Sequence, residues 1–382
     1  MEIILKVTER CILSCKYCYF FRGGDLSYKE HPPYISQEFI KNLCNFLRKG
    51  IKDLSIPNIK IVLHGGEPLL LGKKKFAYLC NALTQALYDI IPLKFSMQTN
   101  GLLIDEEWIE LLIKHNVTNI GISIDGPKKY HDQNRIYPNG KGTYDNLIEK
   151  IAILQKNMPE KIGTLTVINH NYNGKEIYRH FVDELKINNF DFLLHDYHHE
   201  YKPNHDLCKD TEVLIDIFHE WVKDDDPNID IRILRSFLGQ LVGRDGLMYG
   251  VGSVTKNQEN ELPIITIRSS GDLEPVDELV STGSYVKTNC NIFNTSLKNF
   301  LNHPIFNKIK LAQTILPAEC RKCCWEKICG GGALSNRFSK QKGFDNPSVY
   351  CEGLKDFFTH LTAYLLNSGV SLSKIESTLF DS

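Results

Sequence analysis

The chain has 382 residues, a formal net charge of −1 and 42% hydrophobic residues. These values indicate a large globular domain with an appendage, and the near-neutral charge argues against general nucleic-acid binding. No apolar run of the sequence reaches the length of a membrane span, and the charged residues 1–7 are not typical of a signal peptide. Twelve cysteines without a secretion signal favour metal binding in a reducing compartment, so we expect a cytoplasmic protein.

A strand-like run at residues 2–7 leads into a loop with three closely spaced cysteines, Cys11, Cys15 and Cys18. Iron–sulfur clusters take thiolate ligands, and an ordinary [4Fe–4S] cluster takes four. No fourth cysteine follows before Cys44, which lies in a helical pattern. A cluster held by these three thiolates would therefore leave one iron open to another ligand. A zinc loop or a chance grouping is the alternative, although zinc prefers four ligands in CxxC-type pairs.

Strand-like and helical segments alternate along the first 240 residues. Strands are expected at 2–7, 58–63, 94–97, 119–124, 163–168 and 190–194, with helices after them, two of which begin at the N-caps Ser36 and Asp105. This alternation favours an α/β fold with a parallel sheet, in which sites form at the carboxyl ends of the strands. The cysteine loop and the polar segments 64–68, 98–101 and 125–127 all follow strands, so we expect them on one rim.

The character of the chain changes near residue 245, where glycines become frequent at Gly246, Gly250 and Gly252. A β-hairpin is expected next, with strands at 264–268 and 273–276 joined by the turn 269–272. The last thirty residues have a helical, amphipathic pattern. We therefore predict a partial barrel at 1–242 and a C-terminal domain with a terminal helix at 243–382.

The spacing of the first three cysteines, with the aromatic Tyr17 just before the third, resembles the signature of the radical S-adenosylmethionine (SAM) enzymes. This resemblance implies a partial (β/α)6 TIM-like barrel. It also implies that the open iron chelates the amino and carboxylate groups of SAM. An electron from the cluster would then split SAM to a 5′-deoxyadenosyl radical, which abstracts a hydrogen atom from the substrate.

Gly65, Gly66 and Glu67 resemble the GGE motif of that family, which binds the amino group of SAM. Two glycines allow close backbone approach, and a carboxylate suits an ammonium group, although an ordinary turn is the alternative. By the same resemblance, polar side chains after the strands and Arg135 would contact the ribose and carboxylate of SAM, unless they form a turn and a surface charge. The full set of expected SAM contacts is Tyr17, Gly65, Gly66, Glu67, Gln98, Asn100, Ser123, Asp125 and Arg135.

A second group of cysteines lies near the C-terminus and supplies four thiolates, enough for a complete [4Fe–4S] cluster: Cys320, Cys323, Cys329 and Cys351. This run resembles the SPASM C-terminal extension of peptide-modifying radical SAM enzymes. A structural zinc ion is the alternative, because zinc would accept the same four thiolates.

The chain departs from the full SPASM pattern at two positions. Ala333 stands four positions after Cys329, where the pattern has a cysteine, and Val276 stands where the hairpin would carry another. One auxiliary cluster is therefore expected to be complete and the other to be lost. Asp277 lies near the place of the lost cluster, and by analogy it is a candidate proton acceptor.

The remaining cysteines and one histidine-rich segment are less informative. Free cysteine in a helix usually acts as a small buried apolar side chain, and three cysteines are expected to be structural: Cys44, Cys80 and Cys208. Cys290 and Cys324 are either spare ligands or ordinary thiols. The segment 195–200 could line a substrate channel, form a chance metal-like grouping or lie at a solvated edge.

The segment 18–28, followed by Pro32-Pro33, is most similar to XYE/Grr-type maturases, some of which form three-residue cyclophanes in ribosomally made precursor peptides. Those enzymes join an aromatic ring carbon to the β-carbon of a residue two positions later. The resemblance implies two partners, a precursor peptide and an electron donor such as flavodoxin or ferredoxin, and no nucleic acid or membrane. Because the first strand starts at the N-terminus, any contact with a leader peptide is expected to use the barrel, the hairpin or the C-terminal helix.

In the expected mechanism, a β-carbon radical adds to the aromatic ring, Asp277 takes the ring proton and the auxiliary cluster takes the remaining electron. Sulfatase-maturase-like oxidation of a Ser or Cys side chain is an alternative, although that group normally carries both auxiliary clusters. Thioether formation is a further alternative, and a non-enzymatic zinc or iron–sulfur scaffold is another. The Gly65-Gly66-Glu67 motif argues against the scaffold, which needs no SAM pocket.

Overall fold

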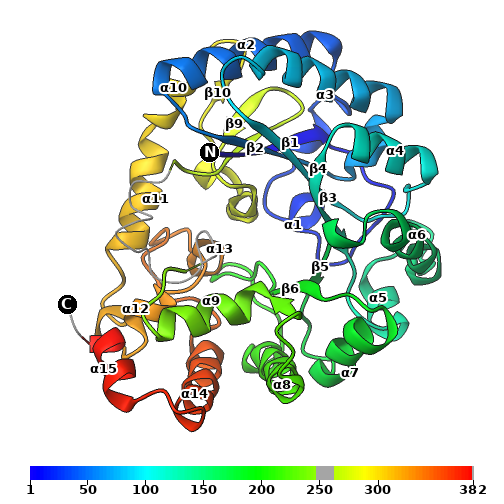
Figure 1. Cartoon of the computed structure of the whole chain (residues 1–382). Helices are drawn as coiled ribbons and strands as arrows, with labels where there is room; N and C mark the ends of the chain where they lie inside the picture. The colour runs from blue at the N-terminus through cyan, green and yellow to red at the C-terminus, as the bar shows by residue number, and fades with distance from the viewer. Residues whose placement is uncertain (247–261, 381–382) are drawn as a thin grey trace. The chain divides into compact units, whose positions relative to one another are not determined.

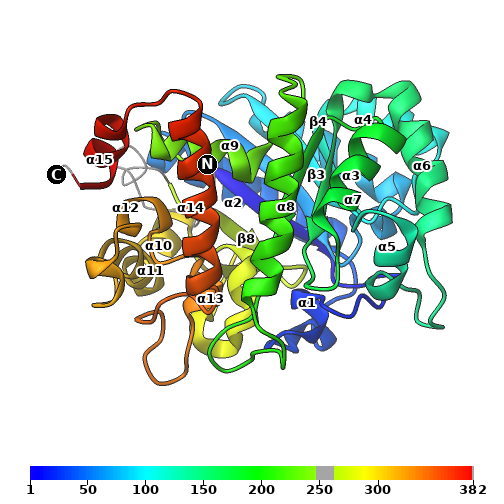
Figure 2. The same cartoon turned by 90° about the horizontal axis from the view of Figure 1, so that it is seen from below.

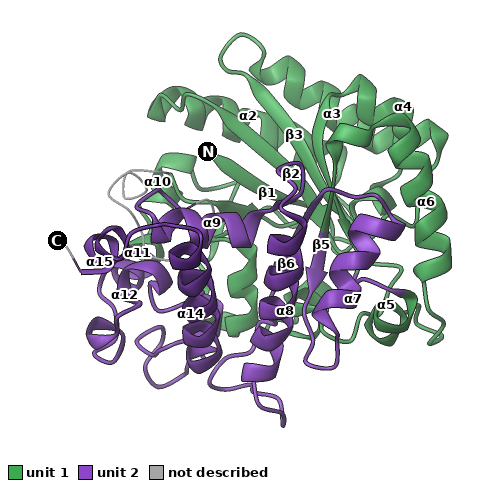
Figure 3. Ribbon diagram, turned by 60° about the horizontal axis from the view of Figure 1, so that its bottom comes forward, with its two compact units in different colours: residues 1–124, 128–164, 262–307 green, residues 125–127, 165–261, 308–382 purple. Residues whose placement is uncertain are grey.

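The computed structural model describes residues 1–246 and 262–380, so Gly250 and Gly252 lie outside the described residues. The described chain forms two compact units (Figure 3). Unit 1 contains residues 1–124, 128–164 and 262–307, and unit 2 contains 125–127, 165–246 and 308–380. Each unit combines segments that are far apart in the chain, whereas the expected domains 1–242 and 243–382 divide it sequentially and stay a prediction. No described helix is long and apolar enough to cross a membrane.

Unit 1 is built on a mainly parallel sheet. Its strands are β1 (Glu2–Thr8), β2 (Ile59–Gly65), β3 (Leu93–Thr99), β4 (Val117–Ser123), β8 (Ile265–Ile267), β9 (Asp272–Glu274) and β10 (Cys290–Asn291). Their order is β10-β9-β8-β1-β2-β3-β4. The pairs from β8 to β4 are parallel. β9 pairs antiparallel with β8 and β10, which confirms the hairpin expected in this region.

Long helices cover one side of these strands: α2 (Gln37–Leu54), α3 (Lys73–Leu87) and α4 (Glu106–Lys114) (Figure 1). Two of the expected helix starts are confirmed, because Ser36 accepts a hydrogen bond from the N–H of Phe39 at 3.0 Å and Asp105 accepts one from Trp108 at 2.9 Å. The other elements are α1 (Tyr19–Arg22), α5 (Lys128–Asn134), α6 (Tyr144–Asn157), α10 (Leu297–Leu301) and the 3₁₀ turns Ser27–Lys29, Pro68–Leu71, Pro159–Lys161 and Asp277–Val286. β5 (Ile162–Val167) and α11 (Pro304–Thr314) run from one unit into the other.

Unit 2 combines a short parallel strand pair, β6 (Asn189–Leu193) and β7 (Asp230–Ile231), with helices. These are α7 (Gly174–Arg179), which continues as the π-helical turn His180–Glu184, α8 (Cys208–Asp224), α9 (Arg232–Leu241), α12 (Glu326–Cys329), α13 (Leu334–Arg337), α14 (Cys351–Asn367) and α15 (Leu372–Phe380), with a 3₁₀ turn at Cys320–Lys322. α8 and α14 lie side by side (Figure 2), and the rings of Phe218 and Tyr364 meet edge to face there. The expected helical C-terminus is therefore two helices.

Candidate functional site

The loop that carries Cys11, Cys15 and Cys18 connects β1 to α1 in unit 1. Its main chain is tied to the segment after α5, since the N–H of Ser14 donates to the carbonyl of Ile136 at 2.8 Å. Arg22 adds a side-chain hydrogen bond to the carbonyl of Cys15 at 2.9 Å. These bonds give the three thiols a defined frame although the loop has no regular secondary structure.

The thiols themselves are half-buried. Burial raises the pKa of Cys11 to about 12 and also raises the pKa of Cys18, although the nearby Lys6 and Arg135 cations lower the latter. Iron ligation removes these protons, because thiolate is the ligand form. Among the described residues, neither cysteine set places three sulfurs all within 4.8 Å of one another.

Gly65 and Gly66 lie where β2 ends, directly against the start of the cysteine loop. The N–H of Gly66 donates to the carbonyl of Thr8 and that of Glu67 to the carbonyl of Arg10, both at 2.9 Å. A Cβ at Gly65 would lie 2.1 Å from the Thr8 oxygen, and one at Gly66 would lie 2.3 Å from the Arg10 oxygen. Only glycine allows this approach of two main chains, so the pair fixes the cysteine loop on the sheet.

Glu67 is fully buried and holds the segment after β3. Its carboxylate accepts hydrogen bonds from the Thr99 hydroxyl at 2.7 Å, the Asn100 N–H at 2.8 Å and the Leu69 N–H at 3.0 Å. Burial raises the pKa of Glu67 to about 7, although these three donors oppose the shift. The structure therefore gives Glu67 a positioning role, and its expected contact with the SAM amino group stays a prediction.

The other expected SAM contacts divide between the two units. Gln98 donates to the Ser123 hydroxyl at 2.9 Å, and the amide of Asn100 lies 3.8 Å from the Cys11 sulfur. Arg135 stacks over the ring of Tyr17 at 5.3 Å from the ring centre. Six members of the expected set thus lie on the cysteine loop or on the strand ends next to it: Tyr17, Gly65, Gly66, Gln98, Asn100 and Ser123.

Asp125 belongs to unit 2. It is fully buried, and its Oδ1 accepts from the N–H of Val167 at 3.3 Å. This contact gives the side chain a part in tying the segment 125–127 to β5. The expected contact of Asp125 with the ribose or carboxylate of SAM stays a prediction.

Asp277 is the centre of a buried polar group in unit 1. Its Oδ2 accepts from the ammonium of Lys6 at 2.6 Å and from the Tyr19 hydroxyl. His64 joins the group, with its Nδ1 3.2 Å from the Lys6 nitrogen. Burial works to raise the pKa of Asp277, but the charge of Lys6 and the two hydrogen bonds from Lys6 and Tyr19 outweigh it and hold the pKa well below the usual range. Burial and Lys6 lower the pKa of His64 to about 4, so this ring is neutral.

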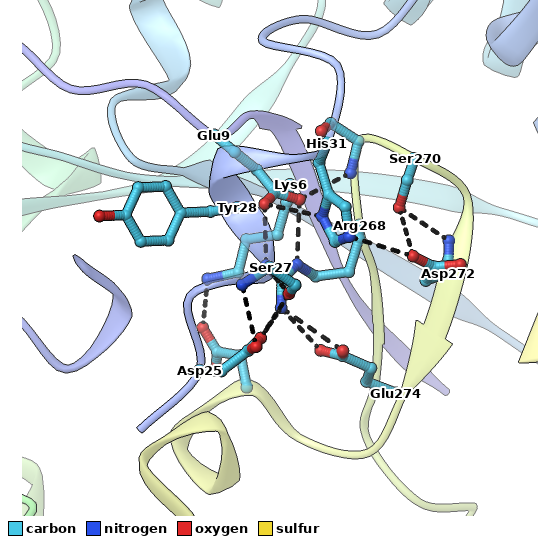
Figure 4. A network of polar contacts seen from close by, with 12 residues as sticks. Lys6, Glu9, Asp25, Ser27, Tyr28, His31, Arg268, Ser270, Asp272 and Glu274 are labelled. Atoms are coloured by element: carbon cyan, nitrogen blue, oxygen red, sulfur yellow. Dashed lines mark hydrogen bonds and ion pairs between the residues drawn. The ribbon is translucent and has the colours of Figure 1, made fainter. Parts of the chain in front are cut away.

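A second buried network ties the hairpin to the cysteine loop (Figure 4). Arg268, between β8 and β9, is 1% exposed and forms ion pairs with Glu9 at 2.8 Å and with Asp25 and Glu274 at 3.1 Å. Glu9 lies at the start of the cysteine loop, and Glu274 lies three residues before Asp277. The network therefore fixes the chain near Lys6, through Glu9, and near Asp277, through Glu274.

The C-terminal cysteines lie in unit 2, which also contains the buried guanidinium of Arg337. Arg337 donates from Nε to the carbonyls of Phe344 and Asn346 at 3.1 Å, while its Nη2 has no hydrogen-bond partner among the described residues. Burial lowers the pKa of Arg337, and the nearby thiols of Cys320 and Cys329 oppose this shift. A buried cation with an unused N–H near the thiols of Cys320 and Cys329 fits a site that carries negative charge, as a thiolate-ligated cluster does.

Comparison with known proteins identifies the first part of the chain. Residues 5–182 match the family model of the radical SAM superfamily. This part of the chain is a radical SAM domain. Radical SAM enzymes bind a [4Fe–4S] cluster and SAM, so the expected cofactors agree with the family.

Longer similarity extends beyond the radical SAM domain. The cysteine-type anaerobic sulfatase-maturating enzyme of Clostridium novyi (strain NT) is 26% identical over 93% of both chains. The serine-type anaerobic sulfatase-maturating enzyme of Bacteroides thetaiotaomicron is 27% identical over 93% of this chain and 87% of its own.

Two solved structures show the same fold. Native anSMEcpe with bound AdoMet superimposes with a TM-score of 0.82 at 24% identity, over 96% of this chain and 98% of its own. Streptococcus suis SuiB bound to its precursor peptide SuiA gives 0.64 at 19% identity, over 92% and 75%. These likenesses confirm the predicted mixed α/β fold with a parallel sheet and a cysteine-rich C-terminal region.

The structure adds functional candidates that the sequence analysis did not single out. Lys6 is one of them, and its only signal in the sequence is a charge between the apolar residues Leu5 and Val7 of β1. The expectation that Cys44 and Cys80 are buried in helices is confirmed. The solvated-edge interpretation of residues 195–200 is wrong for His195 and His198, which are both buried.

Proposed function

We propose that this chain is a peptide-modifying radical SAM enzyme that performs a net two-electron oxidation at a side-chain β-carbon. The observation that carries the proposal is the buried Asp277–Lys6 pair with Tyr19 and His64. Tyr19, which donates to Asp277, directly follows Cys18 in the sequence, and this supports a role for the group near the third cysteine of the loop. A radical oxidation of this kind needs a proton acceptor close to the point where hydrogen is abstracted.

The cofactors, when bound, supply the hydrogen-abstracting radical at the Cys11/Cys15/Cys18 site and an acceptor for the remaining electron at the Cys320/Cys323/Cys329/Cys351 site. The chain's own residues then handle the proton. Asp277 is ionised throughout the neutral range because Lys6 and Tyr19 stabilise its carboxylate. The same pairing makes it a weak base, so the incoming proton donor must displace Tyr19 or loosen the Lys6 contact before Asp277 can accept.

The product that we propose is a cyclophane, in which the β-carbon radical adds to an aromatic ring of the same peptide and Asp277 takes the ring proton. The departures at Val276 and Ala333 support this choice, because the sulfatase maturases that the chain resembles normally carry both auxiliary clusters. A precursor peptide and an electron donor of the flavodoxin or ferredoxin type would be the partners.

Oxidation of a Ser or Cys side chain is the second candidate. Its support is the similarity to sulfatase-maturating enzymes over more than nine-tenths of this chain. The same proton acceptor serves this reaction, since a β-carbon radical on Ser or Cys must lose a proton and an electron to become a carbonyl or thiocarbonyl group.

One experiment separates these products. The reduced holoenzyme is incubated with SAM and peptides that contain an aromatic residue two positions before a second residue, or an internal Cys or Ser. Both reactions remove two hydrogens, but only a crosslink suppresses fragmentation between the joined residues in tandem mass spectrometry. An aldehyde or thioaldehyde instead reacts with a hydrazide reagent. Cleavage of SAM without any modified peptide, over a broad peptide set, would contradict the proposal.

A further inference from the structure

We propose that unit 2 contains a binding site for one divalent transition-metal ion of the zinc type, formed by His170, His205 and Asp210. This site is separate from both cysteine sets, and it does not depend on the proposed function. Within the described part of the chain, these three side chains are the group of His, Cys, Asp or Glu whose ligand atoms all lie within 4.8 Å of one another.

The three ligands come from the segment after β5 and from the start of α8. His170 follows β5, and His205 lies in the connection between β6 and α8. The N–H of Ile168 donates to the carbonyl of Leu193 at 2.8 Å and joins the ends of β5 and β6. Asp210 lies in the first turn of α8 and is fully buried. The ligands therefore come from two places in the fold, the segment just after β5 and the start of α8 with the residues just before it.

The hydrogen bonding of the three side chains is incomplete without an ion. His205 Nε2 lies 3.1 Å from Asp210 Oδ2, and the rings of His170 and His205 stack with their centres 3.7 Å apart. The buried Nδ1 of His170 has no hydrogen-bond partner, and the buried Oδ1 of Asp210 has none of regular geometry. A carboxylate buried beside two imidazoles, with one ring nitrogen unused, costs free energy unless a cation or proton is shared among them.

Two imidazoles and one carboxylate are a ligand set that zinc takes, with a water or another group in the fourth position. A tetrahedral ion holds such nitrogen and oxygen atoms about 3.4 Å apart, so small side-chain movements bring the three ligand atoms into range. The neutral imidazole ring is the form that binds metal. A bound ion would then join the segment after β5 to the start of α8.

The test uses the holoenzyme with its cysteine sites filled by iron, because empty thiolate sites would themselves take up zinc. The anaerobic protein is titrated with zinc sulfate against a chromophoric chelator. We expect one zinc per chain, a rise in the melting temperature on zinc addition, and a loss of affinity of about 100-fold or more in Asp210→Asn. His205→Gln, whose side chain is 17% exposed, provides a second variant if Asp210→Asn folds poorly.

The matched control is His219→Gln. His219 and His360 form another close pair of imidazoles in unit 2, with 2.9 Å between Nε2 and Nδ1, but without a buried carboxylate. The control should keep the zinc affinity of the wild type. Equal zinc binding by the wild type and by both site variants, with iron content unchanged, would overturn the proposal. Absence of zinc binding by the iron-loaded wild type would overturn it as well.

Discussion

The carboxylate of Asp277 is charged at neutral pH and is also the proton acceptor that we propose. Replacing it with asparagine removes the acceptor while keeping its shape, so we expect modified-peptide formation to fall about 100-fold or more. Cleavage of SAM should continue, because Asp277→Asn leaves the cysteine loop intact. The assay measures 5′-deoxyadenosine and modified peptide in the same reaction.

Glu278→Gln is the control for Asp277→Asn, because it removes the carboxylate that follows Asp277 in the sequence. Iron content reports on folding, which matters because the substitution leaves the buried Lys6 ammonium without its partner charge. A modification rate within twofold of the wild type in Asp277→Asn would exclude this residue as the base.

His64 gives the same polar group a dependence on pH. Its pKa falls from 6.5 to about 4 on folding, so the unfolded chain binds a proton that the folded chain does not bind between these values. The contribution of the neutral ring to stability is therefore complete above pH 6.5 and is lost as the pH falls towards 4.

Comparison of the wild type with His64→Gln measures this contribution. Between pH 7.5 and 5.5, the difference in free energy of unfolding between the two proteins should shrink by about 1.4 kcal/mol. Burial raises the pKa of Glu67 to about 7, so its contribution to stability changes with pH in the opposite direction. Glu67 is present in both proteins, so this contribution cancels in the difference. Urea midpoints at the two pH values provide the measurement, with His303→Gln as a half-buried control. A difference that does not change with pH would mean that His64 is not buried neutral.

At the scale of elements, the β8–β9 hairpin is attached through Arg268. Three carboxylates surround this one guanidinium, which is almost without solvent contact. Replacing Arg268 with methionine leaves these groups buried without a cation, so we expect a loss of about 3–5 kcal/mol in the free energy of unfolding. Arg268→Lys should recover only part of it, because a lysine cannot bond two carboxylates with a fork.

Arg48→Met is the matched control in the same unit. Arg48 pairs with Asp89 at 2.7 Å on the surface, where water solvates both groups, so its loss should leave the melting temperature nearly unchanged. Equal melting temperatures for Arg268→Met and Arg48→Met would show that the buried network does not stabilise the hairpin.

Arg337 allows a similar argument for the C-terminal cysteines. If a cluster binds there, the neighbouring guanidinium favours the reduced, more negative state. Arg337→Met should then lower the reduction potential by about 60 mV or more, which is a factor of ten for a one-electron couple. Electron paramagnetic resonance during a redox titration measures the shift. Arg337→Lys keeps the positive charge, so its reduction potential should stay close to that of the wild type. Arg321→Met, which changes an exposed residue, should leave the potential unchanged. An unchanged potential in Arg337→Met would show that Arg337 does not have this role.

Local signals explain which elements could be predicted. The strand ends, the Ser36 and Asp105 caps and the 269–272 turn depend on residues close together in sequence, and the structure confirms them. Lys6 and Asp277 are 271 residues apart, and nothing in their local sequence indicates a 2.6 Å contact. The role of Glu67 illustrates the same limit, because its partners Thr99 and Asn100 lie at the end of a different strand, β3.

At the scale of the whole molecule, chain order and compact units do not coincide. Unit 1 takes its hairpin from residues after 262, and unit 2 takes β6 and α8 from the middle of the chain and the auxiliary cysteines from its end. The segment 262–307 therefore supplies Arg268 and Asp277 to the unit that holds the radical SAM cysteines. A truncation at residue 242 would remove both residues from unit 1.

Metal content tests the molecule as a whole. Anaerobically purified protein should contain about eight irons per chain, four for each of the two cysteine sets. About four irons should be lost in the triple alanine variant of Cys11, Cys15 and Cys18, and about four in Cys320→Ala. Cys324→Ala changes an exposed thiol outside both sets and should lose no iron. About four irons that disappear entirely in the triple variant would make the C-terminal set a zinc site or an empty one. About twelve would mean that Cys290 or Cys324 helps to bind a third cluster, and this result would favour sulfatase-maturase-like oxidation over the crosslink.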